Sequence, residues 1–301
     1  MPPDRYRAVR SARPIAGPRK RLTGRIGLYR LYSRVVCTIT VHSRADYADY
    51  YAKPVCVVRA VGGSGSMLID TSFDFRVDAR GKDPDSHSPT LRRYHKRLWS
   101  RPLPGGVAFE LRDTTPGVYL HHRSGLGEFQ LSSDAVIATF IRYEATARII
   151  EQIPQAEHDE FDRLGYTMGG MMVFPGNQVD RKPTINAVRG FNRKISDRMD
   201  LTLECVRRHY RHEDSPLAPA LGRYAGFFAL FEDFRGYVDF FLLQDLVSAD
   251  YEAVRFFMPF TDFSPPAIPR DLDTYLEFRR SSIKFTKARN RRIDQLALDV
   301  D

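Results

Sequence analysis

Hydrophobic residues that alternate with polar ones mark the first ordered part of this chain. In "DTSFDFRVD" (70–78), Phe73, Phe75 and Val77 follow a two-residue period, which predicts a strand. Four further segments have strand composition, and the first three have short connections, at 107–113, 118–123, 128–133 and 169–175. The pattern therefore predicts an antiparallel meander followed by one fully apolar strand.

A helical period replaces this alternation elsewhere. Ser88 and Pro89 have the chemistry of a cap and a first helical position, so they predict a helix over 90–99. Ser133–Asp134 likewise predicts the start of a long amphipathic helix over 135–153. Two later segments are helical, namely 184–210, with a break at Gly190 or Ser196–Asp197, and 270–298. The fold class is therefore α+β, with a small antiparallel sheet early in the body packed against a mainly helical C-terminal half.

The charge of the chain is unevenly distributed. Residues 1–66 contain 13 Arg or Lys and three Asp or Glu, which gives them a net charge of +10. Residues 67–301 have a net charge of −1, and the two parts together give the +9 of the chain. This shift and the glycine-serine run at 62–66 predict a boundary, with a single α+β domain over 67–301. Three interpretations of 1–66 stay open: a disordered basic arm that contacts nucleic acid or lipid, a small strand-rich addition, or translated upstream sequence with Met67 as the start.

Cysteine content and hydropathy indicate the compartment. The chain has three cysteines, an odd number, and no two of them have the spacing of metal ligands (Cys37, Cys56 and Cys205). A disulfide framework is therefore not expected, and we expect a cytoplasmic protein. No apolar run approaches the roughly 18 residues of a membrane span, so no membrane partner is expected. Motifs for zinc proteases, paired cysteines and phosphate-binding Walker loops are absent from the sequence, which predicts no metal site and leaves any cofactor unknown.

Five segments of the body resemble a bacterial domain family that has no assigned function. They are "SHSPTLRRYHKRLWSRPLPGG" (86–106), "LGEFQLSSD" (126–134), "FPGNQVDRKPTIN" (174–186), "RGFNRKISDRMDLTLECVRRHY" (189–210) and "GYVDFFLLQDLV" (236–247). The resemblance extends from about Leu68 to Ile293 and leaves residues 1–66 out. It supports the boundary near Met67 and implies no catalytic residue.

The best candidate site begins where the apolar strand ends. A turn from strand to helix directs main-chain N–H groups at one point, which attracts anions. Helical spacing then puts Asn186, Arg189 and Arg193 on one face. The predicted ligand-binding residues are Asn177, Asn186, Arg189, Arg193 and Arg198, with Asp200 and Glu204 as the candidate catalytic acid/base groups. The alternative is a surface helix braced by ion pairs along Asp200, Glu204 and Arg208.

A second candidate is the basic helix at Leu91–Trp99 with its flanking residues. Its cations are Arg92, Arg93, His95, Lys96, Arg97 and Arg101, and Tyr94 and Trp99 lie between them. Guanidinium groups bind phosphate and aromatic faces stack on bases, so the helix is a candidate RNA contact. In the alternative interpretation it is a solvated helix face with its aromatic residues in the core.

Two functions from different classes follow. The first is a protein that binds, or acts on, a phosphate-bearing ligand such as a nucleotide or an RNA end. The second is a non-catalytic interaction module, homo-oligomeric or bound to a partner, that uses its apolar helical half, including "GYVDFFLLQDLV". The sequence does not decide whether the protein is an enzyme.

Overall fold

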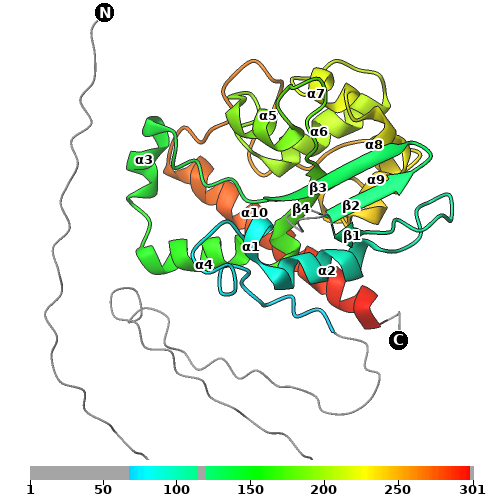
Figure 1. The fold of residues 1–301 in the computed structure, drawn as a ribbon. Helices are drawn as coiled ribbons and strands as arrows, with labels where there is room; N and C mark the ends of the chain where they lie inside the picture. The colour runs from blue at the N-terminus through cyan, green and yellow to red at the C-terminus, as the bar shows by residue number, and fades with distance from the viewer. Residues whose placement is uncertain (1–67, 114–119, 299–301) are drawn as a thin grey trace, which may run out of the picture. The chain divides into compact units, whose positions relative to one another are not determined.

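The computed structural model describes residues 68–113 and 120–298 of the 301-residue chain. The chain divides between Gly65 and Ser66 into two units, and the described residues belong to the second. The interpretations of residues 1–66 and the expected turn at 114–117 lie outside the described residues. The described part combines helices with a four-stranded antiparallel sheet, so the predicted α+β class is confirmed (Figure 1).

The sheet has the strand order β1-β2-β3-β4, and each neighbouring pair is antiparallel. The strands are β1 (Arg112–Asp113), β2 (Leu120–Ser124), β3 (Gly127–Ala135) and β4 (Met171–Pro175). The pairing of β2 with β3 begins at Leu120 opposite Leu131, whereas β4 pairs with β3 from Leu131 to Ala135. Among the described residues, the end of β3 beyond Leu131 therefore has a strand on one side only.

The predicted cap before the first long helix is confirmed. After the short helix α1 (Pro84–His87), α2 spans Pro89–Trp99, and the Ser88 Oγ accepts a hydrogen bond from the Leu91 N–H at 3.0 Å. Tyr94 and Trp99 are buried, so the interpretation that puts the aromatic residues of this helix in the core is confirmed.

The predicted strand over 70–78 is wrong, because this segment forms turns. The Asp70 and Asp74 side chains accept hydrogen bonds from the main-chain N–H groups two residues further on, at 2.9 and 3.0 Å. Such turns compete with strand pairing for the same main-chain groups. The alternation of apolar residues therefore does not mark a strand. Of its three members only Phe75 is buried, whereas Phe73 is half-buried and Val77 is exposed.

The predicted long helix over 135–153 is also wrong. Strand β3 continues to Ala135, and α3 spans only Glu144–Ile150. The ladder extends past the strand, because the Val136 N–H donates to the Gly170 carbonyl at 2.8 Å. The consecutive residues 136–138 are all buried, which an amphipathic helix on a surface does not allow.

The rest of the chain is mainly helical, as predicted. The elements are α4 (Gln155–Gly165), η1 (Met168–Gly170), α5 (Ile185–Phe191), α6 (Met199–Tyr210), α7 (Ala218–Gly222), α8 (Ala225–Ala229), α9 (Phe234–Phe240), η2 (Gln244–Leu246) and α10 (Leu272–Leu298). Ser196 and Asp197 have φ angles of 48° and 63° between α5 and α6, so the break lies at one of the two expected positions. None of the described helices is long and apolar enough to cross a membrane.

Aromatic side chains of α8, α9 and the turn after α9 fill the core. Phe231 lies 5.3 Å from Phe227 and 5.0 Å from Phe241, measured between ring centroids. The apolar segment 236–247 contributes to this core, so it does not form an exposed partner-facing helix. Helix α10 crosses the molecule in contact with η1, α4, η2 and α3, and its C-terminal end lies next to α2 (Figure 1).

Candidate functional site

The structure places Arg189 inside the protein as a connector between elements. Its guanidinium donates to Asp134 Oδ2 at 2.7 Å, to Thr202 Oγ1 at 2.8 Å and to the Asp197 carbonyl at 3.3 Å. The same group lies 4.9 Å from the centroid of the Phe174 ring. Because its side chain is fully buried and its donors are occupied, Arg189 fastens β3 to α5 and α6.

Asp134 and Asp197 share this one cation. Arg189 Nη1 lies 2.7 Å from the Asp134 carboxylate and 3.6 Å from that of Asp197. Burial raises the pKa of Asp134 above its ordinary value, and the charge of Arg189 opposes this shift. The Asp134 side chain keeps 26% of its surface exposed, so the cluster reaches the protein surface at the end of β3.

Arg198 and Asp200 form a buried ion pair. Arg198 Nε and Nη2 donate to the two Asp200 oxygens at 3.1 and 2.5 Å. Asp200 also accepts a hydrogen bond from the Phe257 N–H at 2.8 Å. Asp200 is therefore enclosed, and its oxygens are used within the fold rather than presented to a ligand.

Glu204 is held by its own helix. Arg207 and Arg208 each donate to its carboxylate at 2.8 Å. Burial raises the pKa of Glu204, but the hydrogen bonds from the two arginines outweigh burial, so the pKa lies below its ordinary value. An ionised, doubly paired carboxylate of this kind matches the alternative of a helix braced by ion pairs.

The remaining predicted residues lie in different surroundings. Asn186 Nδ2 donates to Ser132 Oγ at 2.9 Å, next to the Asp134 cluster. The Asn177 carbonyl accepts a hydrogen bond from the Tyr224 hydroxyl at 2.8 Å. Arg193 is exposed, and its carbonyl accepts from the Ala267 N–H at 2.9 Å. The structure therefore does not bring the predicted set together. Asn186 and Arg189 lie at the end of β3, and Arg193 and Arg198 contact the loop before α10, whereas Asn177 contacts Tyr224 and Glu204 pairs within α6.

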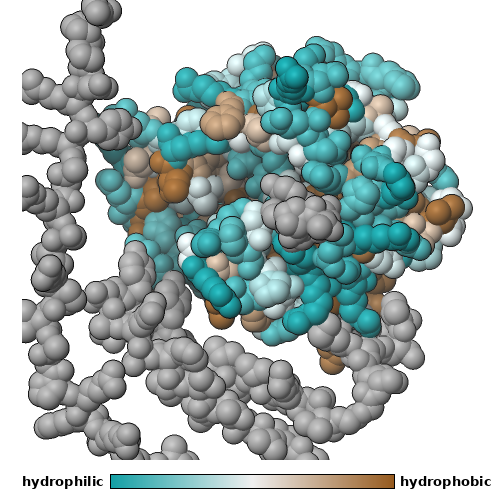
Figure 2. Space-filling model, in the orientation of Figure 1, coloured by the Kyte–Doolittle hydropathy of each residue, from teal (hydrophilic) through white to brown (hydrophobic). Residues whose placement is uncertain are grey.

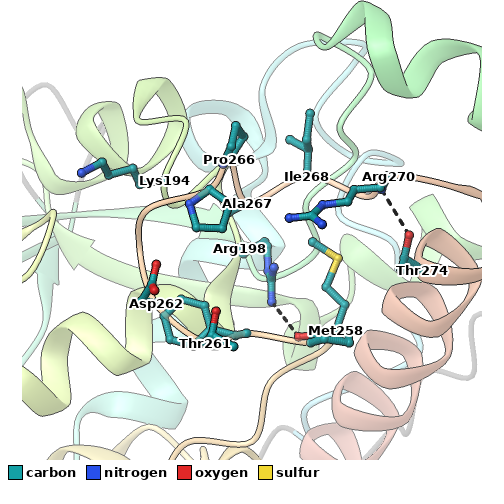
Figure 3. A pocket seen from close by; sticks show the side chains of 13 residues that line it. Lys194, Arg198, Met258, Thr261, Asp262, Pro266, Ala267, Ile268, Arg270 and Thr274 are labelled. Carbon is teal, nitrogen blue, oxygen red and sulfur yellow. Dashed lines mark hydrogen bonds between the residues drawn. The ribbon is translucent and has the colours of Figure 1, made fainter.

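A cavity of about 270 Å³ lies where Arg198 meets this loop, and we call it the Arg198 cavity. Figure 3 shows the guanidinium groups of Arg198 and Arg270 facing its middle. The lining residues are Lys194, Arg198, Met258, Pro259, Phe260, Thr261, Asp262, Pro265, Pro266, Ala267, Ile268, Arg270 and Thr274. Of the residues predicted from the sequence, only Arg198 lines it.

The wall of the cavity is fixed at both ends. Arg198 Nη2 reaches the Met258 carbonyl at 3.5 Å, and the Arg270 N–H donates to Thr274 Oγ1 at 3.2 Å. Asp271 Oδ1 accepts from the Thr274 N–H at 2.9 Å just before α10 begins. Four prolines in the loop restrict its conformations further (Pro259, Pro265, Pro266 and Pro269).

Positive charge dominates the Arg198 cavity. Lys194 and Arg270 are exposed, and within the described part of the chain neither forms an ion pair. Asp262 is the one carboxylate among the lining residues, and hydrogen bonds from Ser264 lower its pKa. No group of three or more His, Cys, Asp or Glu in the described ranges has a geometry that could hold a metal ion.

Comparison with known proteins places most of this structure in one family. The family described as "Family of unknown function (DUF6994)" matches residues 69–293, a range that includes the sheet and the whole Arg198 cavity. No match was found among curated proteins or among solved structures. Because the matched range is more than half of the chain, the protein belongs to this family of unknown function.

Proposed function

We propose that this protein binds a small phosphate-bearing ligand, such as a nucleotide or a phosphorylated RNA end, in the Arg198 cavity. The observation that carries the proposal is that two guanidinium groups from separate segments, those of Arg198 and Arg270, face one hollow, with Lys194 as a further cation among its lining residues. Arginine binds phosphate through paired N–H donors, and a rigid wall lowers the entropy lost on binding. The volume of about 270 Å³ lies just below the usual range for ligand pockets, which begins at about 300 Å³, so the cavity suits a small ligand or one that remains partly in solvent.

The role of each cation differs. Asp200 neutralises most of the charge of Arg198, which therefore supplies a fixed donor at the base of the cavity. Arg270 is exposed and supplies a second guanidinium that faces the phosphate, and Lys194 adds charge at the rim. No described carboxylate that lines the cavity has a raised pKa, so we propose binding rather than acid/base catalysis there.

The test is isothermal titration calorimetry of the full chain with AMP and with inorganic pyrophosphate. Arg270→Ala should weaken binding at least tenfold, since a charge-assisted hydrogen bond contributes about 1.5–3 kcal/mol. Lys284→Ala removes an exposed cation of α10 outside the cavity and should leave binding unchanged. Absence of heat with both probes at millimolar concentration, or an equal loss in the two variants, would contradict the proposal.

One observation favours a second function, contact with another protein. Phe191 is 85% exposed and Ile141 is 70% exposed, and they adjoin Gly190 and Arg142, which lie against each other. The face in Figure 2 is largely hydrophilic with scattered apolar side chains. Phe191→Ser should abolish an oligomer measured by light scattering if this pair is an interface, and should change nothing if the protein acts alone.

The cellular location is also a proposal. Cys205 is a free thiol in the core, and burial raises its pKa to about 12. Such a cysteine packs as a small hydrophobic residue and is compatible with a reducing compartment, so we propose the cytoplasm.

A further inference from the structure

A groove between α2 and the C-terminal end of α10 has a volume of about 510 Å³. We call it the α2 groove. It is lined by Ile69, Arg93, Lys96, Arg97, Leu98, Ser100, Arg101 and Leu296. It shares no residue with the Arg198 cavity, so any ligand it binds goes beyond the proposed function.

Four of these eight lining residues are cations, and none of the described lining residues is a carboxylate. Arg93 and Arg97 are four residues apart on α2, with Lys96 between them, so they project from successive turns of one face. Arg101 follows four residues later, just after the helix ends. Arg93 and Arg97 are therefore separated along α2 by about one helical turn, about 5.4 Å, and Arg101 extends the row beyond the end of the helix.

Two of these four cations, Arg101 and Lys96, are held differently. Arg101 donates to the Phe240 carbonyl and lies 4.8 Å from the Phe240 ring centroid, and burial lowers its pKa to about 10, so it stays charged at neutral pH. Lys96 pairs with Asp113 at 2.7 Å, but both side chains are more than a third exposed. Exposed pairs of this kind are weak and exchange readily with another anion.

The residues at the floor of the α2 groove limit the kinds of ligand that the groove can bind. Leu98 and Ile69 are almost fully buried and leave little apolar surface for a peptide to cover. Tyr94 and Trp99 face the core, so neither ring can stack on a base. Hydrophilic side chains cover the part of the surface where α2 lies (Figure 2).

We infer that the α2 groove binds single-stranded nucleic acid through its phosphates and does not read base sequence. Three of the four cations are arginines, whose planar donors match phosphate oxygens. A regular row of cations fits a chain with one charge per nucleotide better than it fits an acidic peptide, which needs apolar anchors as well. The partner is therefore the sugar–phosphate backbone of a single strand.

The experiment measures fluorescence polarisation of a labelled 12-nucleotide oligo(U) with the full chain at several salt concentrations. Arg93→Gln/Lys96→Gln/Arg97→Gln should raise the Kd at least tenfold at low salt. The slope of log Kd against log salt should fall by about 2, since each lost phosphate contact on a single strand contributes about 0.7. Glutamine keeps the helical propensity, and the single variant Arg93→Gln tests the same point if the triple variant does not fold.

The matched control is Arg19→Gln/Lys20→Gln/Arg21→Gln, which removes the same charge from residues 1–66. It should lower the affinity by less than the α2 variant does, and Arg270→Ala should leave oligo(U) binding unchanged. An equal loss in the two triple variants would overturn the inference, because binding would then follow net charge alone. Tighter binding of a 12-residue poly-Glu peptide than of oligo(U) would overturn the ligand class.

Discussion

Three of the four buried arginines among the described residues show how the fold compensates a buried positive charge. Arg189 lies between two carboxylates, and Arg198 pairs with Asp200. Arg289 instead donates to the carbonyls of Phe241, Gly169 and Met171 at 2.8–3.1 Å, and burial lowers its pKa to about 9. These three side chains join separate parts of the fold, so the main role of these buried arginines is to stabilise the structure.

The Arg198–Asp200 pair gives a prediction about stability. Arg198→Met leaves the Asp200 carboxylate buried without its cation, and loss of one partner of a buried pair costs about 3–5 kcal/mol. The double variant Arg198→Met/Asp200→Leu removes both charges and should recover most of that loss. Urea denaturation measures both variants, and equal destabilisation of the two would show that the pair itself is not the source.

A hydrogen-bonded chain runs from Trp99 through His95 to Ser133. The Trp99 Nε1–H donates to His95 Nδ1 at 2.9 Å, so the ring proton lies on Nε2, which donates to Ser133 Oγ at 2.9 Å. Burial, with a smaller contribution from Arg289, lowers the pKa of His95 to about 3. His95 is therefore neutral at physiological pH and does not act as a base toward Ser133.

Asp85 lies at the other side of Ser133 and makes stability depend on pH. The Ser133 N–H donates to Asp85 Oδ1 at 2.6 Å. Burial raises the pKa of Asp85 from 3.8 to about 6; hydrogen bonds from Ser133 and the charge of Arg92 oppose this shift, and Asp83 adds to it. Between these two values the unfolded chain loses a proton that the folded chain keeps, so this group lowers stability as the pH rises from about 4 to above 6.

The variant Asp85→Asn tests this sign. It keeps an oxygen for the Ser133 N–H and removes the charge, so it should gain stability relative to the wild type between pH 4 and pH 7.5. The gain should reach up to about 3 kcal/mol, because one pKa unit corresponds to about 1.4 kcal/mol. Denaturation at both pH values measures it, with Glu277→Gln on the surface of α10 as control. A variant that is equally destabilised at both pH values would contradict the assignment.

At the scale of elements, side chains form hydrogen bonds with main-chain groups of β3 that have no strand partner. Beyond Leu131, the described part of β2 no longer pairs with β3, and the Ser133 N–H and carbonyl are satisfied by Asp85 and Asn186 at 2.6 and 3.4 Å. Helix α1 thus covers the free side of β3. The requirement that main-chain groups be paired explains why polar residues gather at this end of the strand.

The start of α2 gives the prediction for this scale. Ser88 Oγ accepts from the Leu91 N–H and donates to Asp78 at 2.5 Å, so it links the cap to the preceding turn. Ser88→Ala should lower the free energy of unfolding by about 0.5–2 kcal/mol, the usual range for a lost cap. Thermal denaturation measures it, and Ser86→Ala, whose hydroxyl has a long contact of 3.5 Å with Asp83, should cost less. A larger loss at Ser86 would contradict the capping role.

For the whole molecule, the periodicity of hydrophobic residues correctly predicts the helices and strands that are determined by nearby residues in the sequence. The cap and burial of α2, the apolar strand β4 and the long α10 follow from residue spacing alone. The predicted strand over 107–113 is shorter than expected, since β1 spans only Arg112–Asp113. Two larger errors arise where side chains decide the backbone, since Asp70 and Asp74 form turns and Asp134 binds Arg189 instead of capping a helix. A single sequence contains no signal for such contacts.

The candidate site likewise depends on contacts between residues that are distant in the sequence. The sequence identifies the arginines after β4, but it does not reveal that Asp134 and Asp200 neutralise them. Arg270 reaches the Arg198 cavity from a loop far along the chain, so no local spacing could indicate it. Candidate chemistry within one helix is predictable, whereas the cavity is a product of the tertiary fold.

The most direct test of the account is native mass spectrometry of the full chain, purified without a denaturing step, beside Lys194→Ala/Arg270→Ala. The account predicts that the wild type retains a phosphate-bearing small molecule and that the double variant loses it while keeping its fold. A wild-type mass without ligand that also shows no uptake of added AMP or pyrophosphate would contradict it. Retention of the same ligand by the double variant would contradict the assignment of the Arg198 cavity.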